Sequence, residues 1–113
     1  VPVLGIIENM SYFTPAELPD NKYYIFGERG AEYLAQDKEV PFLGGIPLIQ
    51  SVREAADFGR PASLQEDSQV GEEFVDITKK LVSQVVFRNK NLPPTKAVEI
   101  TNLVGCEAVK SQL

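Results

Sequence analysis

Two short runs of consecutive apolar residues constrain the fold of this chain most. They are residues 1–7, VPVLGII, and residues 40–46, VPFLGGI. A strand with one solvent-facing side alternates apolar and polar residues, whereas a strand covered on both faces is apolar throughout. The two runs therefore predict buried strands of a parallel sheet that has helices on its faces.

Helical patterns follow each run. Residues 27–38 and 49–58 have apolar side chains at helical spacing, and Gly59 stands where a left-handed C-cap would end the second of these helices. A third helix over about residues 70–90 is predicted by Asp67 or Ser68 as N-cap and by one apolar stripe. The residues of that stripe are Val70, Phe74, Ile77, Leu81 and Val85.

The remaining segments predict connections. Residues 9–21 contain Pro15 and Pro19 and predict a loop, residues 23–26 a short extended piece, residues 91–94 a linker and residues 97–101 a short strand. Strands that alternate with helices indicate an α/β fold with a parallel sheet. Two core strands are too few for a stable sheet, and no Met precedes Val1, so we expect an excerpt from a longer protein.

Composition excludes several classes of function. The 113 residues include 11 basic and 16 acidic side chains, a net charge of −5, and no basic cluster that would favour a nucleic-acid partner. No apolar run approaches the ~20 residues of a membrane span, so no membrane partner is expected. With no histidine and only Cys106, His-dependent catalysis and a self-contained zinc site are excluded, and a stand-alone enzyme is disfavoured. A lone cysteine also favours a cytoplasmic location.

The candidate ligand contacts follow the two predicted strands. Asn9 comes after the first strand, and Pro47 and Leu48 come after the second. Ligands of open parallel sheets bind outside the carboxyl ends of the strands. The Asn9 amide offers a donor and an acceptor for the edge of a purine, while Pro47 and Leu48 offer a flat apolar wall. Alternatively, Asn9 only caps a turn and Pro47 only ends a strand.

Five segments, in order, resemble one family. They are LGIIENMSYF at residues 4–13, IFGERGA at 25–31, VPFLGGIPL at 40–48, REAADFGRP at 53–61, and Asp67-Ser68 before the last helix. Each looks like the corresponding segment of the Mrp/ApbC-like P-loop ATPases, relatives of the MinD and ParA ATPases that act as iron–sulfur cluster carriers. The resemblance covers about residues 1–90.

The resemblance implies a partial P-loop NTPase fold. Residues 1–90 would form the C-terminal half of the ATPase domain, and residues 91–113 a linker and tail. The full protein of this family binds ATP with Mg²⁺, forms a homodimer and passes a [4Fe–4S] cluster to apo-proteins. By resemblance, Asn9 contacts the adenine amino edge, and Pro47 and Leu48 line the other side of the base.

Two family features are missing from the sequence. No Gly-x-x-x-x-Gly-Lys-Ser/Thr phosphate loop occurs, so the chain by itself should not hydrolyse ATP and needs the N-terminal half of the domain as partner. Where many members carry Cys-x-x-Cys, residues 14–20 read TPAELPD, which makes a bound [4Fe–4S] cluster doubtful. The carboxylates of Glu17 and Asp20 are hard ligands that suit such clusters poorly, and Cys106 is the sole thiol.

Other readings stay open at this point. An aromatic-rich stretch predicts either a dimer or client surface or the packing that anchors the proline-rich loop. Its members are Tyr12, Phe13, Tyr23, Tyr24 and Phe26. Arg53 and Asp57 predict a surface ion pair at helical spacing, and Glu28 with Arg29 a solvated helix start. The chain as a whole could instead be a non-catalytic interaction domain that keeps the ATPase fold, or could self-associate through an open sheet edge.

Overall fold

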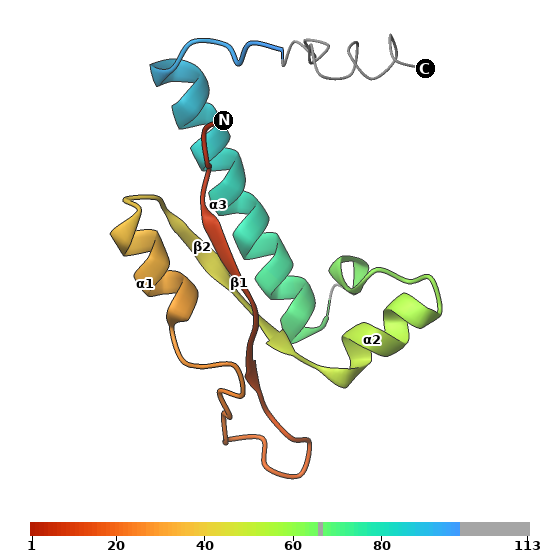
Figure 1. Ribbon diagram of the computed structural model, residues 1–113. Helices are drawn as coiled ribbons and strands as arrows, with labels where there is room; N and C mark the ends of the chain where they lie inside the picture. The colour runs from red at the N-terminus through yellow and green to blue at the C-terminus, as the bar shows by residue number, and fades with distance from the viewer. Residues whose placement is uncertain (66, 98–113) are drawn as a thin grey trace, which may run out of the picture.

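The computed structural model describes residues 1–65 and 67–97. The predicted strand at 97–101 and Cys106 lie outside the described residues, apart from Ala97 itself. The elements in chain order are β1 (Ile6–Phe13), α1 (Gly30–Asp37), β2 (Phe42–Leu48), α2 (Gln50–Asp57), the 3₁₀ turn η1 (Ala62–Leu64) and α3 (Gln69–Asn91) (Figure 1). This order confirms the predicted alternation of strands and helices.

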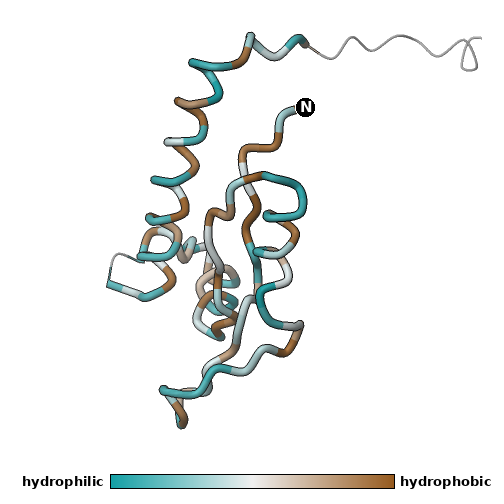
Figure 2. The backbone as a smooth tube through the Cα atoms, turned by 90° about the vertical axis from the view of Figure 1, so that its left-hand side faces the viewer, coloured by the Kyte–Doolittle hydropathy of each residue, from teal (hydrophilic) through white to brown (hydrophobic). Residues whose placement is uncertain are grey.

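The two strands pair in parallel and are covered from both sides. Glu8 pairs with Gly45, and its carboxylate reaches the backbone of α1. The neighbouring Gly44 instead faces Ile77 of α3. Because successive residues of a strand point to opposite faces, α1 and α3 cover opposite faces of the sheet, as Figure 2 shows. The predicted α/β arrangement, a parallel pair flanked by helices, is confirmed.

The core of the described residues is small. Its buried apolar side chains are Ala35, Leu43, Ala55, Val70 and Ile77. Many larger side chains remain exposed, among them Phe87 on α3, at 64% exposure, and Val82. A sheet of two strands cannot cover both helices, and this leaves a large apolar surface without a partner among the described residues.

The first strand differs from its predicted bounds at both ends. β1 begins at Ile6 rather than Val1, because β2, its partner, begins only at Phe42, which lies opposite Ile6. It continues through Phe13, so residues 9–13 are strand and not loop. A register irregularity between Asn9 and Phe13, with Met10 at φ 54°, allows this continuation.

The helices follow their predictions more closely. α1 starts at Gly30 rather than Gly27, because Gly27 at φ 98° and Arg29 at φ 58° are not helical. Gly59 has φ 68°, as its predicted C-cap role requires. At the start of α3 the Ser68 hydroxyl accepts a 3.0 Å hydrogen bond from the Gly71 N–H, which confirms Ser68 as the N-cap. Among the described residues no helix has the length and apolarity needed to cross a membrane.

Gly44 allows the close contact of β2 with α3, and its replacement tests this contact. A Cβ at Gly44 would lie 2.9 Å from Cγ1 of Ile77, and the residue has φ 145°. We expect Gly44→Ala to lower the free energy of unfolding by about 2–4 kcal/mol, through overpacking and backbone strain. Urea denaturation measures the change.

Gly27→Ala is the matched control. Gly27 also has a positive φ, of 98°, but nothing lies within 4 Å of its added Cβ. In this variant the free energy of unfolding should fall only by the cost of backbone strain, about 1–2 kcal/mol. Equal losses of unfolding free energy in Gly44→Ala and Gly27→Ala would show that the nearby Ile77 side chain does not exclude a Cβ at position 44.

Candidate nucleotide-binding site

The carboxyl ends of β1 and β2 meet at a cavity. Phe13, the last residue of β1, pairs with Leu48, the last residue of β2. A cavity of about 440 Å³ lies there, lined by Phe13, Leu48, Ile49, Gln50 and Arg53. Its volume falls within the ~300–1,000 Å³ of ordinary small-molecule sites, and its position is that of ligand sites in open parallel sheets.

The three predicted site residues lie at different depths around this cavity. Leu48 lines it and is 37% exposed. Pro47 is buried directly before Leu48 in β2 and does not line the cavity. Asn9 is exposed on β1 opposite Ile46 and also lies outside the cavity wall. The strands therefore place Asn9 one register position away from Pro47.

The side chain of Asn9 is oriented by its own neighbour. The Met10 N–H donates a 3.0 Å hydrogen bond to Oδ1 of Asn9. Met10 has φ 54°, in the left-handed region, where the register of β1 with β2 becomes irregular. Because Oδ1 is already an acceptor here, the Nδ2 group is the part of the amide that remains as a donor toward a ligand.

Similarity to a known protein family identifies the fold around this cavity. The ParA family, described as NUBPL iron-transfer P-loop NTPase, matches residues 1–82. The chain belongs to this family of P-loop NTPases. The match includes both strands, α1, α2 and most of α3, and so confirms the resemblance seen in the sequence.

The relatives of this NUBPL-type chain are cluster carriers and transfer proteins. It is 44% identical over 85 residues to the iron–sulfur cluster carrier protein of Pyrococcus horikoshii, across 75% of this chain and 28% of that protein. It is 41% identical over 93 residues to the iron–sulfur cluster transfer protein NUBPL of Mus musculus, across 82% of this chain and 28% of that protein. The chain thus spans about a quarter of the length of these relatives.

A second hollow of the NUBPL-type chain lies away from the strand ends. It measures about 390 Å³ and is lined by Ser63 of η1 and by α3 side chains that include Val75 and Lys79. None of its lining residues belongs to a strand. We therefore place the candidate nucleotide site at the ends of β1 and β2.

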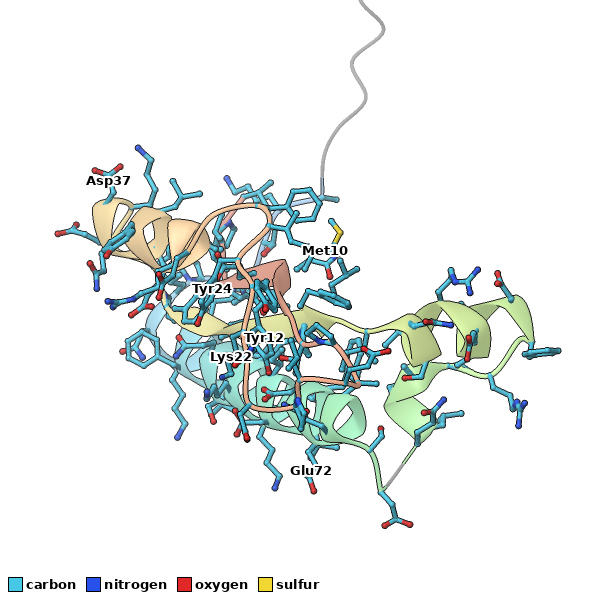
Figure 3. The ribbon with its side chains drawn as sticks, turned by 90° about the horizontal axis from the view of Figure 1, so that it is seen from below. Met10, Tyr12, Lys22, Tyr24, Asp37 and Glu72 are labelled. Atoms are coloured by element: carbon cyan, nitrogen blue, oxygen red, sulfur yellow. The ribbon has the colours of Figure 1, made fainter. Side chains whose placement is uncertain are left out.

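Tyr12 ties the loop after β1 to α3. Its hydroxyl accepts a 3.0 Å hydrogen bond from Nε2 of Gln69, in the first turn of α3. The Tyr24 ring lies edge-on with centroids 6.4 Å apart, and the Lys22 ammonium lies 4.5 Å from the Tyr12 ring centroid (Figure 3). These contacts favour the anchoring role for Tyr12 and Tyr24, whereas Phe26, at 69% exposure, is free for other contacts.

The loop after β1, between Phe13 and Tyr23, is closed at its base. Phe13 and Tyr23 exchange two backbone hydrogen bonds of 2.8 Å, and the loop between them carries Glu17 and Asp20. Residues 1–65 and 67–97 contain no group of three or more His, Cys, Asp or Glu side chains that could hold a metal ion. The donor set in this loop does not fit an iron–sulfur cluster.

Arg29, the residue before α1, pairs with Glu32 of that helix, and with Glu28 it forms the solvated helix start that the sequence predicts. It donates hydrogen bonds of 2.8 and 2.7 Å to the two carboxylate oxygens of Glu32. This hydrogen bonding, with the charge of Arg29, lowers the pKa of Glu32, while the Glu32 carboxylate raises the pKa of Arg29. The Arg29 side chain is half-exposed and that of Glu32 is partly exposed, so the pair supports the first turn of α1 only locally.

The predicted ion pair of Arg53 with Asp57 is wrong. The closest carboxylate to Arg53 is that of Glu54, at 3.8 Å, and Gln50 donates a 2.7 Å hydrogen bond to the same Glu54 oxygen. A spacing of four residues on a helix permits an ion pair of Arg53 with Asp57. The Arg53 side chain instead lines the cavity at the strand ends. Sequence reasoning therefore missed Phe13, Gln50 and Arg53 as lining residues.

Glu8 connects β1 to α1, and the one hint of this role in the sequence is a carboxylate directly after an apolar run. Its Oε1 accepts a 3.4 Å hydrogen bond from the Ala31 N–H, in the first turn of α1. A carboxylate at a helix N-terminus is stabilised by the helix dipole. The contact holds α1 against the strand that carries Asn9.

Replacing Glu8 by Gln tests the dipole interaction. Glu8→Gln keeps the shape and an acceptor but removes the charge, so we expect the free energy of unfolding to fall by about 0.5–1 kcal/mol at low ionic strength. Because salt screens such interactions, the loss should shrink in 1 M salt, which corresponds to a Debye length of roughly 3 Å. Urea denaturation at both ionic strengths measures it.

Glu17→Gln, in the exposed loop, removes the same charge away from any helix start and should leave the unfolding free energy nearly unchanged. A loss that is the same in both variants, or independent of salt, would contradict the role assigned to Glu8.

Proposed function

We propose that this chain is the part of an ATP-dependent iron–sulfur cluster carrier that holds the nucleotide base. The observation that carries the proposal is the cavity between Phe13 and Leu48, at the paired ends of two parallel strands in a member of the NUBPL family. Its relatives named as cluster carrier and cluster transfer proteins supply the cargo class.

The cavity suits the base of ATP. It combines the Phe13 ring and the aliphatic Leu48 and Ile49 with the Gln50 amide, the mixture of flat apolar surface and few polar groups typical of base sites. Asn9 adds an N–H donor from β1, beside buried Pro47. We therefore assign Asn9, Pro47 and Leu48 to the adenine side of the site, with Asn9 donating to an acceptor of the base.

The phosphates and Mg²⁺ require residues from elsewhere. The sequence holds no lysine-bearing phosphate loop, so the triphosphate would be bound by the N-terminal half of the same domain. The apolar surface of α3 that has no partner among residues 1–65 and 67–97 gives that half a place to pack. Bound ATP would supply the phosphoryl group that is transferred. Asn9, Pro47 and Leu48 would orient its base.

We propose that the iron–sulfur cluster is cargo of the whole carrier and that the loop of residues 14–20 does not hold it. Glu17 and Asp20 are the acidic side chains of the loop in question, and they do not replace a thiolate pair. We propose that any cluster is held outside residues 1–97, with a homodimer and apo iron–sulfur proteins as the partners of the whole carrier. The cytoplasmic location stays a prediction.

The proposed domain boundary follows the end of α3. Residues 1–90 form the C-terminal half of the ATPase domain, and α3 itself ends at Asn91. Arg88 then donates a 3.3 Å hydrogen bond to the Pro93 carbonyl and another to the Thr95 hydroxyl, which fixes the start of the linker.

A second candidate function is an interaction domain that keeps the ATPase fold without catalysis. The exposed Ile25 and Phe26, between the aromatic loop and α1, favour it, because apolar side chains of this size at a surface are typical of protein contacts. Under this hypothesis neither ATP nor iron binds, and the same two side chains form the partner surface.

ATP binding by the full-length protein separates the two functions. We expect Asn9→Ala to weaken ATP binding by about tenfold, since a hydrogen bond to a base edge contributes roughly 1–1.5 kcal/mol. Isothermal titration calorimetry measures the affinity. Asn21→Ala, in the exposed loop, is the control and should bind ATP as the unmodified protein does.

Anaerobic iron reconstitution completes the test. ATP hydrolysis together with cluster uptake supports the carrier, and hydrolysis without iron uptake would mean an ATPase with another cargo. No ATP binding by the unmodified protein would favour the interaction domain, and an unchanged affinity of Asn9→Ala would remove Asn9 from the site.

A further inference from the structure

The wall of the base cavity contains a polar network that the assignments above leave unused. On the first turns of α2, Nε2 of Gln50 donates a 2.7 Å hydrogen bond to Oε1 of Glu54. The Arg53 guanidinium lies 3.8 Å from the same oxygen. Gln50 and Arg53 both line the cavity, whereas Glu54 does not, so the Glu54 carboxylate orients the Gln50 amide from outside the cavity wall.

Arg53 is only loosely held by this carboxylate. A separation of 3.8 Å is too long for a hydrogen bond, and the Arg53 side chain is 69% exposed. Its planar guanidinium can therefore stack on a flat ring that enters the cavity. Phe13 comes from β1 and Arg53 from α2, so the cavity has an aromatic ring on one element and a cation on the other.

Gln50 presents a defined hydrogen-bonding edge. The group that faces the Glu54 carboxylate must be a donor, which makes it the amide nitrogen and leaves Oε1 as the free acceptor. A free acceptor favours a base with an exocyclic amino group. It disfavours a base with a carbonyl at the same position, because two acceptors would then face each other.

We infer that Arg53 stacks on a purine base in this cavity and that Gln50 selects a purine with an exocyclic amino group. The inference rests on the proposed function, since it names residues that would recognise the base of the same nucleotide. It adds a positioning residue and a specificity-determining residue to the predicted set of Asn9, Pro47 and Leu48.

Titration of the full-length protein with ATP and with ITP tests both roles, because inosine has a carbonyl where adenosine has its amino group. We expect Arg53→Ala to weaken binding of both nucleotides by about two- to fivefold, the size of a cation–π contact at an exposed site. Arg53→Lys should recover little of the affinity, since an ammonium keeps the charge but lacks the planar face. Gln50→Leu should weaken ATP but not ITP, so that the ratio of the two affinities falls.

Arg60→Ala is the control for Arg53. Arg60 lies just after α2, 5.7 Å from the Phe58 ring centroid, and does not line this cavity, so its variant should bind both nucleotides as the unmodified protein does. Circular dichroism melting confirms that each variant is folded. Gln50→Leu and Arg53→Lys keep the test valid if Arg53→Ala unfolds.

Two results would overturn this inference. The proposed function would still stand in both cases, provided that the unmodified protein binds ATP. In the first, the folded Arg53 variants bind ATP as tightly as Arg60→Ala does. In the second, the ratio of ATP affinity to ITP affinity in Gln50→Leu equals that of the unmodified protein. Failure of the unmodified protein to bind either nucleotide overturns the proposed function and the inference with it.

Discussion

The parallel pairing of β1 with β2 is the constraint on which the rest of the structure depends. It sets Phe13 against Leu48, and thereby brings the ends of two strands 35 positions apart (48 − 13) to one edge of the sheet. α2 begins two residues after Leu48, so Gln50 and Arg53 reach that edge without a long loop. The candidate site is a direct consequence of strand register and of one short connection.

One of the two irregularities in that pairing lies beside the candidate site. Between Asn9 and Phe13 the register shifts, and Met10 adopts φ 54°. At this point the Met10 N–H donates to the Asn9 side chain. Bulges of this kind redirect side chains near functional sites. The cost of a left-handed non-glycine residue, of order 1–2 kcal/mol, is consistent with a conformation kept for the orientation of Asn9.

The sequence allowed the fold class and several local features to be predicted, because these depend on nearby residues. Two uninterrupted apolar runs predicted parallel strands, and Ser68 predicted the start of α3 through a hydrogen bond that spans only three residues. The bulge at Met10, the contact of Glu8 with Ala31 and the pairing of Arg53 with Glu54 were not predicted. The first two depend on how separate elements dock, and the third on a choice among rotamers that spacing alone leaves open.

The small core agrees with the proposal that the nucleotide site is divided between two parts of a domain. Besides Pro47, the described residues bury five apolar side chains, while α3 leaves Val82 and Phe87 exposed. Burial of such surface against further strands and helices stabilises a larger domain by roughly 25 cal/mol per Å². The same packing would bring a phosphate-binding segment to the edge where Phe13 and Leu48 meet, because ligands of open parallel sheets bind at the carboxyl ends of the strands. Under the proposed function, the packing that completes the core therefore also completes the nucleotide site.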